Sequence, residues 1–523
     1  MTHAPLRPSR PAGFALAVAA TLVCVLGVPS VGSAQSADAA AVAEPGNEVV
    51  AQIPARVALR RAEAAIDPDP GAAPSRDATL ALRDLALALP RLDGADRRAA
   101  KGLLARPTDK KDPQRDSYKT AEAPPVCSAN FCVHYVTTTG DAPNLADVAP
   151  ANGVPDYVEA ISLAAETAFA VENGVLGWPD AKSDGNLGGG APHLVDIYLV
   201  NIGNDGLFGY AAPDPPPAQR CGRSCFSYLV LDNDYSPSEF GYPDPGIPLR
   251  VTLAHEYNHV LQFGIDAIQD GWLFESTAVW AEEKVFPNDN DYLNYLKRFA
   301  RTPSTPITAF DGAGGLKVYG LATFQHWLDT GDGNFGPGVV LGNWKFSTKT
   351  KPKDFAVASV DRSIRELGGG GFAQEFSEFA AASAEWRTGG GFPDATAYPD
   401  VKRKGSLKPG QHKNFTLDHT AYRLLNVAPG AKPTLTLRVK AERKVATGIA
   451  LVGRDDDTAT VTRVVKRLKK GGKGSVTLAG ATGFERVTAV IVNADGTTSG
   501  FLQQLRDWVY TKDNKRFTAT LKG

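Results

Sequence analysis

The sequence lacks the charge imbalance and the long apolar segments that are typical of nucleic-acid-binding and membrane-spanning proteins. Its 56 basic and 57 acidic residues leave a net charge of −1, so bulk electrostatics favour neither nucleic acid nor a membrane surface. After residue 28, no stretch is long and apolar enough to cross a membrane. Methionine occurs once, at position 1, and cysteine occurs only five times. With 43% hydrophobic residues, the 523-residue chain is expected to fold into about three globular units.

The first residues predict export. Two arginines precede an apolar run over residues 13–28, and Gly32-Ser33-Ala34 is typical of a small-residue cleavage site. Because the run is short and Pro29 follows it, we expect a cleaved signal peptide over residues 1–34 rather than a spanning helix. The protein is therefore expected to be secreted, whether it is then released or stays at the cell surface.

Four cysteines remain after this cleavage, in two close couples: Cys127 with Cys132, and Cys221 with Cys225. An even number of cysteines in an exported chain indicates disulfide bonds. Pairing within each couple is the simplest of the three connectivities that four cysteines allow. A cysteine zinc site is the alternative, but exported thiols oxidise.

The segment AHEYNHV, residues 254–260, is the strongest functional signal in the chain. His255 and His259 are four residues apart, so on a helix they share one face and can bind one metal ion together. Glu256 is offset from them and can reach a water molecule on that metal. Neutral imidazoles suit Zn²⁺, and Pro248 just ahead is a helix-start signal. The alternative is an ordinary histidine pair that arises by chance.

A third metal ligand is available in WLFESTAVWAEE, residues 272–283. Glu275 lies 16 residues after His259, which leaves room for the first helix to end and a second to begin. Glu275 would complete a set of two histidines and one glutamate, and Glu282 on the same face could orient a ligand. The alternatives are a helix N-terminal acid for Glu275 and a solvated acid for Glu282.

This pattern, H-E-x-x-H followed by W-L-x-E-x-x-A-x-W-x-E, resembles the gluzincin metallopeptidases, the superfamily that includes thermolysin. The sequence over about residues 125–395, with CVHYVTTTG and NGVPDY, is similar to a family of secreted bacterial metalloproteases. The resemblance implies that His255, His259 and Glu275 bind zinc and that Glu256 is the general base. The chain departs from thermolysin in having Phe before Glu275 and a shorter spacing, so it is not a close relative of thermolysin.

Two related classes are excluded by single residues. Metzincins need glycine and a third histidine where this chain has Gln262 and Ile265, and their methionine turn is impossible because Met1 is the sole methionine. For the same reason the G-x-M-x-N signature of zinc aminopeptidases is missing, which favours endopeptidase action.

A zinc peptidase also needs a hydrogen-bond donor for the oxyanion that develops on the scissile carbonyl. Tyr319, in GGLKVYG, resembles the catalytic tyrosine of zinc aminopeptidases, which follows the third ligand at the start of a helix. The alternative for Tyr319 is an ordinary core or cleft tyrosine. His326 is the rival donor, although its place within the next helix indicates packing.

Composition and periodicity divide the exported chain into parts. Residues 35–125 predict a short helical N-terminal segment, with helices over 77–89 and 95–104, followed by a charged linker. This segment is either a removed pro-segment or an appendage that the mature protein keeps. Over residues 401–523, alternating apolar runs between Gly, Asp and Lys turns predict a separate all-β, sandwich-like domain.

Residues 126–400 are expected to form the catalytic domain, an α+β zincin-like fold with helices around a cleft. Strand signals occur over 132–138, 194–200 and 228–231, and a helix is expected over 156–172. The run 228–231 comes shortly before the histidine helix, where zincins have an edge strand that pairs with extended substrate. This run is therefore expected to bind the peptide main chain.

We thus expect a secreted zinc endopeptidase that acts on protein or peptide substrates. The alternatives are a non-catalytic cell-surface binding protein on a protease-like scaffold and a zinc amidase that acts on peptidoglycan. A basic cluster around Lys466 and Lys473 could contact cell-wall polymer, although a solvated hairpin turn is favoured. Acidic groups at 232–234 and 288–291 offer oxygen ligands for Ca²⁺, but neither has the spacing of an EF-hand.

Overall fold

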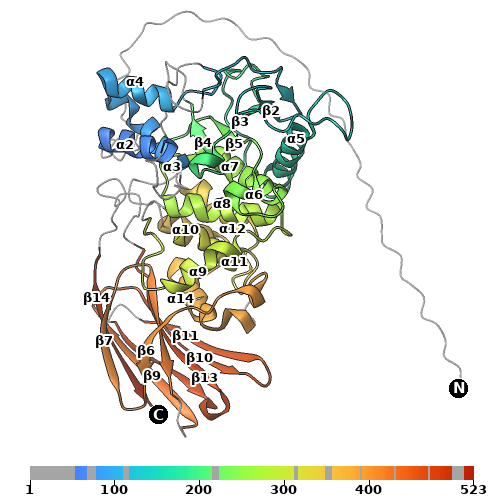
Figure 1. The fold of residues 1–523 in the computed structure, drawn as a ribbon. Coiled ribbons are helices and arrows are strands. Elements are labelled where there is room, and N and C mark those ends of the chain that lie inside the picture. The colour runs from blue at the N-terminus through green and yellow to red at the C-terminus, as the bar shows by residue number, and fades with distance from the viewer. Residues whose placement is uncertain are drawn as a thin grey trace, which may run out of the picture. The chain divides into compact units, whose positions relative to one another are not determined.

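The computed structural model describes residues 54–67, 78–109, 117–214, 223–310, 316–347, 356–388, 391–428, 432–468, 472–496 and 512–523. Within these residues the fold mixes helices with three β-sheets, two of them in a β-rich C-terminal region (Figure 1). The predicted signal peptide and Cys221 lie outside the described residues. None of the helices in the described part is long and apolar enough to cross a membrane.

Three helices make up the described N-terminal segment: α2 (Ala55–Ile66), α3 (Ala78–Ala88) and α4 (Gly94–Leu103). The helices expected over 77–89 and 95–104 are α3 and α4, whereas the sequence analysis did not identify α2. Every residue of α3 is buried, including the polar residues Thr79, Arg83 and Asp84. Helix α3 lies beside strand β4 of the first sheet (Figure 1).

The first sheet has the strand order β1-β2-β3-β5-β4. Strands β2, β3 and β5 are parallel to one another, and β4 runs antiparallel to β5 at the edge of the sheet. The strands are β1 (Val126–Cys127), β2 (Phe131–His134), β3 (Val195–Val200), β4 (Gly209–Pro213) and β5 (Ser227–Asp232).

The prediction that run 228–231 is the edge strand is wrong. This run belongs to β5, which lies between β3 and β4, and all six residues of β5 are buried. A continuous apolar run is typical of such a parallel inner strand, because both of its faces are covered. The edge strand next to β5 is β4, formed by residues that come earlier in the chain.

The expected disulfide between Cys127 and Cys132 is confirmed, and it joins β1 to β2. Cys225 is also disulfide-bonded. Because Cys221 is not among the described residues, the pairing of the second couple stays a prediction.

Helices cover the first sheet and continue towards the C-terminal region (Figure 1). The expected helix 156–172 is α5, which continues as a π-helix over Ala170–Val175. The long helices α7 and α8 pack against each other and carry the histidine and glutamate motifs. The bounds are α5 (Asp156–Phe169), α6 (Pro237–Phe240), α7 (Gly246–Asp266), α8 (Gly271–Val285), α9 (Leu293–Arg301), α10 (Lys317–Gly320), α11 (Ala322–Asp329), α12 (Gly338–Ser347), α13 (Val357–Glu366) and α14 (Phe372–Ala382).

The C-terminal region contains a sheet with the order β11-β10-β13-β8-β6 and a second sheet with the order β12-β9-β14-β7. Alternate residues of both sheets enter one apolar cluster, which includes Leu425, Leu437 and Phe517. The opposite face of the five-stranded sheet packs on the helices, where Ser383 donates a hydrogen bond to the hydroxyl of Tyr422. The strands are β6 (Arg403–Leu407), β7 (His412–Leu417), β8 (Ala421–Val427), β9 (Thr434–Ala441), β10 (Thr447–Asp455), β11 (Thr460–Arg467), β12 (Lys473–Ala479), β13 (Arg486–Asn493) and β14 (Lys515–Lys522).

Candidate metal centre

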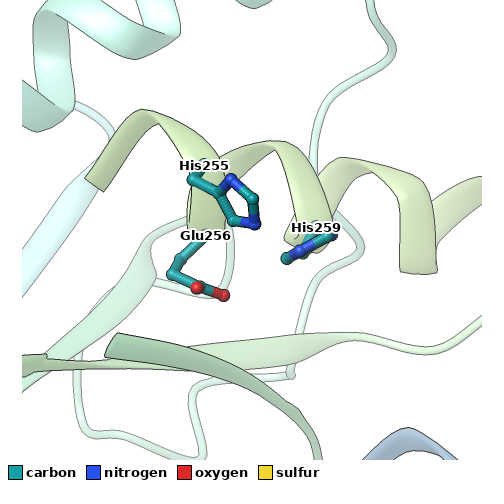
Figure 2. A group of neighbouring side chains, drawn as sticks. All are labelled: His255, Glu256 and His259. Atoms are coloured by element: carbon teal, nitrogen blue, oxygen red, sulfur yellow. The ribbon is translucent and has the colours of Figure 1, made fainter. Parts of the chain in front are cut away.

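Helix α7 holds the two histidines close together, as their spacing predicts. His255 and His259 lie one turn apart with ring centroids separated by 4.6 Å, and both side chains are almost completely buried. Figure 2 shows the two rings turned toward one another, with Glu256 on the same stretch of helix. Ligand atoms of these three residues all lie within 4.8 Å of one another.

Helix α8 adds Glu275 to this pair. One of its carboxylate oxygens, Oε2, lies 3.2 Å from Nε2 of His255 and 3.7 Å from Nε2 of His259. Proximity alone offers either Glu256 or Glu275 as a third ligand. The contacts separate them, because Glu275 touches both imidazoles whereas Glu256 accepts a hydrogen bond from Thr79 at 2.8 Å.

Gln262 fixes the orientation of the His259 ring. Its amide nitrogen donates to the main-chain carbonyl of Phe274 at 3.1 Å and to Oδ1 of Asn258. Because a main-chain carbonyl can only accept, the side-chain nitrogen of Gln262 must face Phe274. The side-chain oxygen of Gln262 therefore faces His259. That oxygen lies 2.7 Å from Nδ1 of His259, which therefore carries the ring proton. Nε2 of His259 is then directed at Glu275.

Glu282 performs the same task for His255. Its Oε1 accepts a hydrogen bond from Nδ1 of His255 at 2.6 Å, and both side chains are shielded from solvent. Nδ1 therefore carries a proton, and Nε2 is directed at Glu275. Carboxylate and amide partners of this kind are common around metal-binding histidines, because they hold the ring and raise its basicity.

The donor atoms fit a small metal ion. Within the described part of the chain, Nε2 of His259 is buried and has no hydrogen-bond partner, which is costly unless a ligand satisfies it. In a tetrahedral zinc site with bonds of about 2.0–2.1 Å, the ligand atoms are about 3.3 Å apart. The observed separations of 3.2 and 3.7 Å from the oxygen of Glu275 are close to this value. Two nitrogens and one oxygen also form a donor set that zinc accepts.

The charges of the cluster favour a cation. Burial raises the pKa of Glu275, but the imidazoles of His259 and His255 outweigh it and lower the pKa to about 2. Burial lowers the pKa of His255, but hydrogen bonds with Glu275 and Glu282 outweigh it and raise the pKa well above its usual value. A metal ion and a proton therefore compete for the same donor atoms.

Glu256 and Tyr319 line a small cavity beside the histidines. The cavity has a volume of about 50 Å³, and its walls are Leu207, Phe208, Gly209, Val251, Thr252, His255, Glu256, Glu282, Asp291, Tyr295 and Tyr319. The Tyr319 ring stacks on His255, with centroids 5.8 Å apart and an angle of 13° between the planes. In the described residues His326 lies elsewhere, buried against Tyr292, and burial lowers its pKa to about 3. The geometry thus brings Tyr319, rather than His326, to the site.

Four residues around the centre were not identified from the sequence: Thr79, Glu172, Asn258 and Gln262. Asn258 accepts from Gln262 and donates to Glu172 at 2.7 Å, so a line of buried polar side chains runs from His259 into the core. The signal for two of them was present, since Asn258 and Gln262 are polar residues in a helix segment that is otherwise apolar. Thr79 lies 177 residues from its partner Glu256, and no local pattern could have identified it.

The acidic groups proposed for Ca²⁺ are engaged by protein donors. Asp232, Asp234 and Glu239 bring carboxylate oxygens together, but Asp232 accepts main-chain hydrogen bonds from Gly203 at 2.7 Å and Tyr235 at 2.8 Å. In the second group, Asp289 is paired with an arginine and Asp291 accepts hydrogen bonds from two tyrosines. Protein donors thus engage these carboxylates, and calcium binding stays a prediction.

No model of a known protein family matches the chain, and no curated protein is significantly similar to it. The resemblance to gluzincins therefore rests on the residues of α7 and α8 and on the sequence around them. The geometry of His255, His259 and Glu275 is independent of that resemblance, because it follows from how the two helices pack.

Proposed function

We propose that this protein is a secreted zinc-dependent endopeptidase of the gluzincin type, with a zincin-like catalytic domain and a C-terminal β-sandwich. The observation that carries the proposal is the convergence of two imidazole Nε2 atoms and one glutamate oxygen beside a second glutamate. Export is supported by the N-terminal sequence and by the disulfide between Cys127 and Cys132, since such bonds persist in oxidising compartments.

His255, His259 and Glu275 would hold the metal ion. Bound Zn²⁺ would supply a Lewis acid that polarises a peptide carbonyl and makes a water molecule more acidic. Glu282 and Gln262 keep the two imidazoles in the tautomer that leaves Nε2 available.

The proton chemistry falls to Glu256. Its carboxylate opens onto the cavity next to His255, so it can take a proton from the attacking water and pass it to the leaving amine. The hydroxyl of Tyr319, in the wall of the same cavity, would donate a hydrogen bond to the oxyanion of the substrate. Strand β4 would bind the main chain of an extended substrate, because among the described residues no other strand pairs with its outer edge.

The decisive variant is Glu256→Gln. It should keep its zinc and lose hydrolysis of a denatured protein by about 10²–10⁴-fold, the usual contribution of a general base. Glu283→Gln is the matched control, because it changes another buried acid in the helical region that has no hydrogen bond to either imidazole among the described contacts. A chelator should stop hydrolysis, and added zinc should restore it.

Two outcomes would reject the proposal. Full activity of Glu256→Gln at unchanged zinc content would refute the role of Glu256 as general base. Cleavage of peptidoglycan without any cleavage of denatured protein would assign the site to the amidase alternative. The assays use the intact chain and a form cut after Asp109, because Thr79 of the N-terminal segment bonds to Glu256.

A further inference from the structure

Helix α3 of the N-terminal segment is buried although it carries polar side chains. Its eleven residues are all buried, and they include Thr79, Arg83 and Asp84. Buried polar groups need hydrogen-bond partners, so the partners show what the helix is built to contact. For both Thr79 and Arg83 these partners lie around the proposed catalytic centre.

Thr79 makes two contacts that a substrate would need. Its hydroxyl donates to Oε2 of Glu256 at 2.8 Å and accepts the main-chain N–H of Ala211 at 3.0 Å. Ala211 is the middle residue of β4 and pairs with Leu229 of β5. Because N–H groups alternate in direction along a strand, that of Ala211 faces the open edge of the sheet. The side chain of Thr79 thus bonds to the proposed general base. It also fills the position at the sheet edge where the main chain of a substrate would bind.

The middle of α3 contacts the segment that leads to the third ligand. A guanidinium nitrogen of Arg83 donates to the carbonyl of Gln269 at 2.9 Å, in the short connection between α7 and α8. The same guanidinium lies 5.1 Å from the ring of Phe274, the residue before Glu275. Helix α3 therefore spans the centre from Glu256 to the beginning of α8.

A buried charge cluster holds the end of the segment to the first sheet. Arg106 contacts the carboxylates of Asp184, Asp196 and Asp214, and its side chain is 2% exposed. One residue earlier, the carbonyl of Ala105 accepts a hydrogen bond from the hydroxyl of Tyr228 on β5 at 2.9 Å. The segment is thus docked at both α3 and its C-terminal end.

Because Thr79 already bonds to Glu256 and to the main-chain N–H of Ala211, an extended peptide could not pair with Ala211 while α3 is in place. The adjoining cavity of about 50 Å³ has room for a few water molecules, and its walls come from residues between 207 and 319. Helix α3 itself is a poor substrate, since a helical main chain cannot pair with a strand edge as an extended peptide does.

We propose that residues 54–109 are an intramolecular inhibitor, in which α3 covers the substrate-binding surface and Thr79 occupies Glu256 and Ala211. The inference rests on the proposed function. The intact chain is latent, and the centre becomes accessible when the segment leaves.

The test uses the full chain with a recognition sequence for an unrelated protease placed between Asp109 and Ser117. Cutting there turns a tethered helix into a separate fragment, so dilution should release it. We expect hydrolysis per mole of cut protein to rise at least about 10-fold on dilution, while the intact chain stays inactive. Hydrogen exchange at the amide of Ala211 gives a second readout that does not depend on activity or on metal, and it should rise in parallel.

Two variants of the cut chain test the role assigned to α3. Thr79→Val keeps the shape of the side chain but removes its hydroxyl, so the hydrogen bond to the charged Glu256 is lost. The concentration at which half of the fragment has dissociated should therefore rise by about 10-fold or more. Arg98→Ala, an exposed change on α4, should leave that concentration unchanged. Leu85→Asp places a charge in the buried face of α3 and should release the segment if Thr79→Val does not.

The outcomes separate the two proposals. If the intact chain is as active as the cut chain at every dilution, the inhibitor is refuted while the peptidase stands. If exchange at Ala211 rises without any hydrolysis, the segment is a releasable cover and the peptidase proposal fails. If Ala211 stays protected at every dilution, even with Leu85→Asp, the segment is a permanent part of the fold and the inference is wrong.

Discussion

Glu282 is expected to set zinc affinity through His255, without touching the metal. Its Oε1 lies 2.6 Å from Nδ1 of His255 in a buried setting. Hydrogen bonds to charged groups contribute about 1.5–3 kcal/mol, and neutral ones about 0.5–1.5 kcal/mol. Glu282→Gln keeps an acceptor but loses the charge, so it should weaken zinc binding by about 1 kcal/mol, or roughly 5-fold. Glu282→Ala leaves the N–H without an acceptor and should weaken binding about 10–100-fold.

Zinc affinity is measured by competition with a chromophoric chelator at fixed pH, and the unfolding midpoint of each metal-free variant is recorded alongside. Glu283→Gln is the control, because burial raises the pKa of Glu283 to about 8 and the neutral amide therefore resembles its form at pH 7. The expected order of zinc affinity is wild type and Glu283→Gln, then Glu282→Gln, then Glu282→Ala. Wild-type affinity in Glu282→Ala would refute the role assigned to this contact, as would an equal loss in the control.

Three further changes test other parts of the structure. Glu275→Ala should lower zinc occupancy in equilibrium dialysis more than any change at Glu282, and retention of zinc would exchange their roles. Tyr319→Phe should lower kcat by about 10–10³-fold at unchanged zinc content, and a loss in His326→Ala instead would transfer the role to His326. Burial raises the pKa of Glu172 to about 8, so between about pH 5 and pH 8 the folded state keeps a proton that the unfolded state has lost. Stability should therefore fall as pH rises through this window, and Glu172→Gln should flatten the pH dependence of the unfolding midpoint. An unchanged slope in this variant would refute the raised pKa of Glu172.

The metal-binding helices could be predicted from the sequence because their signals are local. The spacing of His255 and His259 places both on one face of a helix, and the spacing of Glu275 and Glu282 does the same on the next. The sequence could not show how α7 and α8 pack. That packing brings Glu275 to both imidazoles and Glu282 to the far side of one.

The edge strand was missed for a physical reason. Strand β4 reads GYAAP, which has little intrinsic preference for a strand, and its extended form depends on pairing with β5. Gly209 allows this strand to lie close to α7, since a Cβ there would stand 2.8 Å from the side chain of Thr252. The contact between Thr79 and Ala211 likewise joins residues 132 positions apart, so only the folded chain reveals it.

Gln262 has a consequence for the order of folding and metal binding. It holds the ring of His259 with its oxygen and the carbonyl of Phe274 with its nitrogen, and Phe274 directly precedes Glu275. One side chain therefore couples the positions of two ligands on different helices. The ligands are held in place by protein contacts alone, so an incoming ion has little side-chain freedom to remove. In small zinc domains the ion supplies the folding free energy, whereas here chelation should leave a folded protein that can take up metal again.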